Sequence, residues 1–246
     1  LQLARELDET ILSLRHNHLD VGLWIFKTKG NIEDVLALDA VLEKNSKDWF
    51  VRETLGYLRR SFARLDVSSR SMFAVVEPGS CFAGTLAELL YAADRSYMLN
   101  AEADRPSIAF SALNFGAYPM VNGESRISAH YCGEVPELPS NKPIDTKSAN
   151  RLGLITSTPD DIDWEEEVCI AVEERVPLRF RKVPAHWVFD LRFKSAASAA
   201  RVWLAGSASA SSTVISTSSP GSRVANSTLS TPDRPPALMM HSVFQS

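Results

Sequence analysis

The stretch EPGSCFAGTLAEL, residues 77–89, follows an apolar run, SMFAVV, and leads into residues with helical apolar spacing. The run is typical of a buried strand, so glycines, a serine and a cysteine lie where a strand turns into a helix. A helix begins with unsatisfied N–H groups and a partial positive charge, and glycines before it let the backbone approach a ligand closely. The junction therefore predicts a site for an anion, or for an oxygen that becomes anionic during a reaction.

Helical and strand patterns alternate on both sides of this junction. Apolar spacing predicts helices over residues 3–15, 32–44, 49–67, 85–95 and 163–176, and strands over 20–28, 72–77 and 97–100. Strand and loop are expected over 108–119, the start of a helix over 123–133, and a helix-to-strand pattern over 145–156. This alternation predicts a layered α/β domain.

Composition restricts the class of protein. The 246 residues are 45% hydrophobic, which is enough for one sizeable domain. The net charge of −4 gives no reason to expect nucleic-acid binding. No apolar run approaches the ~20 residues of a membrane span, and no secretory signal is visible, so we expect neither a membrane nor an export role. Three widely spaced cysteines suggest no disulfide framework and no zinc site, which favours the cytoplasm.

The composition changes near Val176, and we expect residues 1–176 and 177–246 to differ in kind. Residues 177–246 carry eight basic and two acidic residues, a formal charge of +6 in a chain whose total is −4. They are rich in Ser and Ala, with little periodicity, so we expect a tail that is mostly disordered or translated out of frame. A short amphipathic patch at residues 183–193 is expected to dock, and a basic tail that binds a partner is the alternative. The chain also begins inside a helical pattern and without Met, which suggests a fragment of a longer protein.

The residues of the junction suggest an active site. The backbone amides of Gly84, Thr85 and Leu86 are candidate donors to a substrate oxygen. Glu88 lies one turn into the helix, so its carboxylate can reach the same pocket. The alternative for Glu88 is a solvated acid that complements the helix dipole.

Two further residues of the stretch are candidates. Glu77 ends the strand, and Cys81 lies in the connecting loop, where the nearby start of a helix is expected to lower the pKa of its thiol. The alternatives are an ordinary turn residue for Glu77 and a small buried hydrophobic residue for Cys81. The two histidines in the turn RHNHLD have no carboxylate ligands to accompany them, so no metal site is predicted.

The stretch resembles the crotonase (enoyl-CoA hydratase/isomerase) family, in which a strand, a Gly-rich turn and a helix carrying Glu-Leu lead to an acidic residue and a strand. Glu88, Leu89 and Asp94 match those places, and Gly84 matches one of the three glycines. Further on, FGAYPMVNGESRI is similar to a second crotonase segment, which it matches at Gly116, Pro119, Gly123 and Arg126.

Several runs, among them RELDETILSLR, WFVRETLGYLRR and SALNFGAYPMVNG, look like the C-terminal half of a ring-opening branch of this family. The resemblance covers residues 1–176. It implies an incomplete crotonase (ClpP-like) spiral core of ββα units, a homo-oligomer, a CoA thioester substrate, an N-terminal crotonase half as partner, and no metal or organic cofactor. The implied reaction opens the ring of 2,3-epoxybenzoyl-CoA to 3,4-dehydroadipyl-CoA semialdehyde and formate.

The chain departs from the family pattern at two places. The first oxyanion donor can be placed only near Ala37 or Leu38, and the second glutamate falls near Ala112, which cannot transfer protons. Residues that can substitute for the missing glutamate are Asn114, Ser111, Glu124 and Glu77.

Three hypotheses remain open on these residues. In the first, catalysis uses Glu77, Cys81 and Glu88, with Gly84, Thr85, Leu38, Asn114 and Glu124 around the substrate. In the second, the chain is a non-catalytic half that supports an active site elsewhere in a longer protein. A plain CoA-thioester hydratase is the third.

Overall fold

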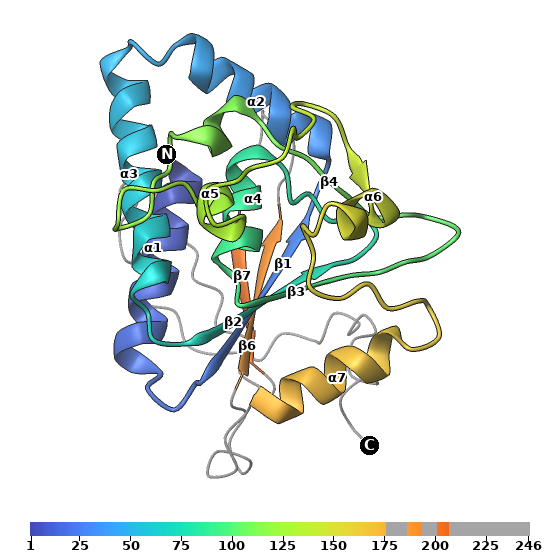
Figure 1. Ribbon diagram of the computed structural model, residues 1–246. Coiled ribbons are helices and arrows are strands. Elements are labelled where there is room, and N and C mark those ends of the chain that lie inside the picture. The colour runs from blue at the N-terminus through green and yellow to red at the C-terminus, as the bar shows by residue number, and fades with distance from the viewer. Residues whose placement is uncertain (176–185, 193–200, 207–246) are drawn as a thin grey trace, which may run out of the picture. The chain divides into compact units, whose positions relative to one another are not determined.

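The computed structural model describes residues 1–175, 186–192 and 201–206, and in the last two stretches only the backbone and the Leu191 side chain. All of these residues belong to one compact unit, Leu1–Ser212. Figure 1 shows a twisted sheet with helices packed against it. The first part of the chain folds into α1 (Gln2–Asn17), β1 (Leu23–Lys29), α2 (Ile32–Lys44), α3 (Trp49–Asp66), β2 (Ser71–Val76), α4 (Gly84–Ala92) and β3 (Arg95–Met98).

The remaining described elements follow, and among them η1 and α5 contact α4. They are β4 (Ser107–Ile108), the 3₁₀ helix η1 (Ala112–Phe115), α5 (Arg126–His130), β5 (Ile144–Asp145), α6 (Thr146–Arg151), α7 (Trp164–Arg175), β6 (His186–Arg192) and β7 (Arg201–Gly206). The helices predicted up to residue 176 are confirmed, with differences of a few residues at their ends, and so are the strands predicted over 20–28, 72–77 and 97–100. The strand expected at the end of residues 145–156 is absent, because α6 is followed there by turns and an isolated bridge at Ser157. The largest difference lies in residues 108–119, where the strand is only two residues long and a 3₁₀ helix follows.

The main sheet has the strand order β3-β2-β1-β6-β7. β2 pairs with β1 and with β3 in parallel, β1 pairs with β6 in parallel, and β7 runs antiparallel to β6. Parallel neighbours need crossovers. The helices α2 and α3 connect β1 to β2, and the helix α4 connects β2 to β3. This arrangement is the layered α/β fold that the alternating pattern predicts, and most pairings in its main sheet are parallel.

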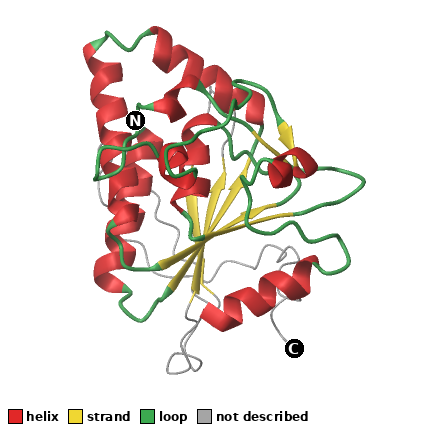
Figure 2. Ribbon diagram, viewed as in Figure 1, coloured by secondary structure: helices red, strands yellow, loops and turns green. Residues whose placement is uncertain are grey.

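Successive residues of a strand point to opposite faces, and here both faces are covered. From β1 and β2, the side chains of Trp24, Phe26, Met72, Ala74 and Val76 pack with α1, α3 and α4. The alternate side chains on β1, β2 and β3 pack against α7 instead: Leu23, Ile25, Phe73, Val75 and Tyr97. Figure 2 shows α7 on the side of the sheet away from the other helices. Burial on both faces explains why SMFAVV is a continuous apolar run rather than an alternating one.

The predicted boundary at Val176 differs from the structure in one respect. Two segments beyond it, β6 and β7, are strands of the main sheet, and β6 contains most of the amphipathic patch that was expected to dock. The physical reason is that β1 would otherwise present an unpaired backbone edge. The rest of residues 177–246, and with it the expectation of disorder, lies outside the described residues.

Within the described ranges, no helix is long and apolar enough to cross a membrane. The same ranges contain no group of three or more His, Cys, Asp or Glu side chains placed to hold a metal ion.

Candidate active site at the start of helix α4

Helix α4 begins deep in the core. Its residues from Gly84 to Leu90 are all buried, and its N-cap residue, Ala83, has no side chain that could accept a hydrogen bond from the helix. The first N–H groups of α4 must therefore find partners elsewhere in the chain or in a ligand.

All three amides that the sequence offered as donors have partners within the chain. The N–H of Gly84 donates to the carbonyl of Ala109 at 3.0 Å, and that of Leu86 donates to the carbonyl of Ala83 at 2.8 Å. The N–H of Thr85 donates to Oδ2 of Asp39 at 2.7 Å. The expectation that these amides are free to donate to a substrate oxygen was wrong, because carbonyl groups and a carboxylate of the protein itself accept their hydrogen bonds.

Asp39 reaches this position from α2. Its Oδ1 accepts from the Thr85 hydroxyl at 2.6 Å and its Oδ2 from the Ser111 hydroxyl at 2.7 Å. The residue is 1% exposed. Burial raises the pKa of the Asp39 carboxyl, and the hydrogen bonds from Thr85 and Ser111 oppose that shift. Thr85 also shares a hydrogen bond with Tyr118, whose hydroxyl lies 3.0 Å away.

The sequence contained a signal for Asp39 that was missed. Asp39 follows the buried Val35 by four residues, so it lies on the inward face of α2, where an acidic residue is unusual. Leu38, expected near the first oxyanion donor, is half-buried beside it. The spacing of residues 32, 35, 36 and 41 predicts that Val41 also lies on the apolar side of this helix, but the structure exposes it.

Glu88 belongs to a second buried group next to the first. Its Oε1 accepts from the Asn114 side-chain amide at 2.7 Å, and its Oε2 accepts from Nη1 of Arg126 at 3.0 Å. The Arg126 guanidinium also donates to Asp66 at 2.8 Å. Burial raises the pKa of Glu88 to about 7, although the positive charge of Arg126 and the Asn114 hydrogen bond act to lower it. Glu88 is thus buried within a hydrogen-bonded network, and the alternative that it is a solvated acid was wrong.

Asn114 joins the two groups. Besides Glu88, its side-chain amide donates to the carbonyl of Gly84 at 2.8 Å, and its Oδ1 accepts from the N–H of Ser111 at 2.9 Å. The residue is buried, so its polar side chain serves contacts within the protein. The structure therefore brings together four of the predicted site residues: Gly84, Thr85, Glu88 and Asn114.

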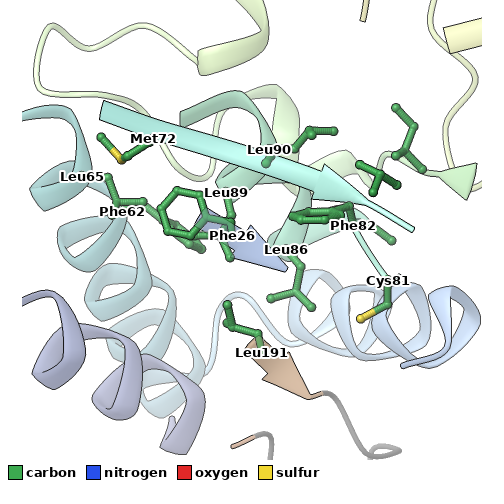
Figure 3. Close-up of a cluster of buried hydrophobic side chains, with 14 of the residues drawn as sticks. Phe26, Phe62, Leu65, Met72, Cys81, Phe82, Leu86, Leu89, Leu90 and Leu191 are labelled. Carbon is green, nitrogen blue, oxygen red and sulfur yellow. The ribbon is translucent and has the colours of Figure 1, made fainter. Parts of the chain in front are cut away.

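Three predicted site residues lie apart from these two groups: Glu77, Cys81 and Glu124. Glu77 pairs with Lys27 at 2.8 Å on a partly exposed surface, and Glu124 is exposed. Cys81 lies in the apolar core, as Figure 3 shows, with its side chain among buried hydrophobic neighbours. Burial raises the pKa of its thiol to about 11. The expected lowering of that pKa was wrong, because desolvation outweighs the nearby helix start.

Two hollows around the described residues lie elsewhere. One of about 300 Å³ lies between β3 and α7, and one of about 550 Å³ lies along α1. Neither is lined by Asp39, Thr85 or Glu88.

The thiol of Cys81 should be inert in the folded protein. With a pKa of about 11, only roughly a thousandth of this thiol is ionised at pH 8, and the side chain is closed off from solvent. The exposed Cys132 is a matched internal control. We expect iodoacetamide at pH 8 to label Cys132 at once and Cys81 only after unfolding in urea, as read by mass spectrometry of peptides. Equal labelling rates in the native protein would contradict this.

The raised pKa of Glu88 predicts a pH dependence of stability. Between the ordinary pKa of 4.5 and the folded value of about 7, the folded state binds more protons than the unfolded state. The free energy of unfolding therefore falls as pH rises through this range, by at most about 3 kcal/mol. The glutamine of Glu88→Gln does not titrate, so this variant should lack this part of the fall in stability. The raised pKa of Asp39 also makes stability depend on pH, but it does so equally in the wild type and the variant. Urea unfolding of the two proteins from pH 4.5 to 8 measures the difference, and a difference that stays constant with pH would contradict the assignment.

The fold has a counterpart among solved structures. An enoyl-CoA hydratase structure from Geobacillus kaustophilus HTA426 superposes with a TM-score of 0.50 at 16% identity, covering 73% of this chain and 67% of that one. An identity this low bears on the fold alone. The described residues therefore have the crotonase fold.

The sequence relates the chain to one particular enzyme. It is 55% identical over 183 residues to the benzoyl-CoA-dihydrodiol lyase of Aromatoleum evansii. The match covers 72% of this chain and 33% of that lyase, so the chain spans about a third of the length of its relative. No protein-family model matches the chain.

Proposed function

We propose that the chain is part of a lyase of the benzoyl-CoA-dihydrodiol type, and that this part supports an active site rather than forming one. The identity to a lyase over 183 residues supports the first statement. Because the chain spans a third of that relative, the activity is assigned to a longer protein containing the chain. Its reaction in this proposal opens 2,3-epoxybenzoyl-CoA to 3,4-dehydroadipyl-CoA semialdehyde and formate.

The observation that carries the supporting role is the hydrogen bond from the N–H of Thr85 to the Asp39 carboxylate. A thioester oxygen that gains negative charge needs preorganised donors that are free to bind it. In this chain the donors at the start of α4 hold a carboxylate of α2 instead, and a second negative charge at that point would be repelled. The donors thus join α2 to α4 and stiffen the domain. In the longer protein this domain packs on an N-terminal crotonase half.

A catalytic role for Glu88 is the second candidate. The observation in its favour is a pKa of about 7, which suits a general acid or base near neutral pH. Against it, both oxygens of Glu88 are engaged by Asn114 and Arg126, and the residue is 3% exposed. A substrate could reach it only if neighbouring elements moved.

Kinetics of the longer protein test the two candidates. In the supporting role, Glu77→Gln and Glu88→Gln should each change kcat by no more than about threefold once folding is verified by thermal unfolding. A loss in kcat of about a hundredfold or more for Glu88→Gln, with the fold intact, would favour the catalytic role. The 246-residue chain alone should show no turnover of the CoA substrate. Hydration of crotonyl-CoA by the chain alone would point to a plain hydratase.

A further inference from the structure

We draw no further inference here: the strongest candidate, the exposed aromatic patch of Trp49 and Phe50 at the start of α3, carries none because nothing in the described parts of the structure shows what covers it.

Discussion

Replacing Arg126 with methionine should lower the free energy of unfolding by about 3–5 kcal/mol. The Arg126 guanidinium is buried and donates to Glu88 at 3.0 Å, to Asp66 at 2.8 Å and to the carbonyl of Tyr118 at 3.1 Å. Methionine fills much of the volume but leaves these acceptors without a donor. Removing one partner of a buried ion pair costs far more than the pair contributes, because a charge stays buried without compensation. Urea unfolding at pH 8 measures the loss.

Two further variants make this result specific. Arg59→Met changes an exposed arginine on α3 and should alter stability by less than about 0.5 kcal/mol. Arg126→Met combined with Glu88→Gln should be less unstable than the sum of the two single losses, because the glutamine carries no charge that needs compensation. A loss below about 1 kcal/mol for Arg126→Met, or strict additivity in the double variant, would contradict the buried network.

Replacing Gly84 with alanine should cost about 3–4 kcal/mol. The new Cβ would meet Oδ2 of Asp39 at 2.0 Å, and the φ angle of +44° is one that alanine rarely adopts. The carboxylate must move away, and its charge-assisted hydrogen bonds to Thr85 and Ser111 are lost or stretched. The loss should appear as a lower urea midpoint with an unchanged m-value, since the fold itself is kept.

Gly56→Ala is the matched control. Gly56 lies within α3, and a Cβ there would meet only the end of the Arg60 side chain, at 3.6 Å. This change should stabilise the protein by about 0.5–1 kcal/mol, because alanine favours a helix more than glycine does. Adding Asp39→Gly to Gly84→Ala should cost less than the sum of the single losses, since the atom in the way is gone. Equal costs for the two glycine substitutions would contradict the close contact.

Most of the fold could be predicted from the sequence, because its signals are local. The apolar run at residues 71–76 predicted a buried strand, and the alternation of strands with helices predicted a layered α/β domain. The pairing of β6 with β1 could not be predicted, because it joins segments more than 150 residues apart and rests on the free edge of β1. The change in composition at Val176 concealed it.

The candidate site was predicted less well than the fold. The sequence placed Gly84, Thr85 and Glu88 at one helix start, and Asn114 beside them, and these residues do come together. It could not show that Asp39, 46 positions before Thr85, supplies the carboxylate that binds their amides and hydroxyls. It also predicted the wrong direction for the pKa of Cys81, because the helix start is visible in the sequence whereas the surrounding desolvation is not.

The order of residues was therefore enough to establish where strand, turn and helix meet, and that the start of α4 must satisfy its N–H groups. Whether those N–H groups are free to bind a ligand or already donate to another part of the chain depended on how α2 packs against α4. No local sequence pattern encodes that packing. The physical reason is that helix and strand periods arise between near neighbours in the chain. The partner of a buried polar group is instead chosen by the packing of distant segments, and here that packing placed a carboxylate of α2 at the start of α4.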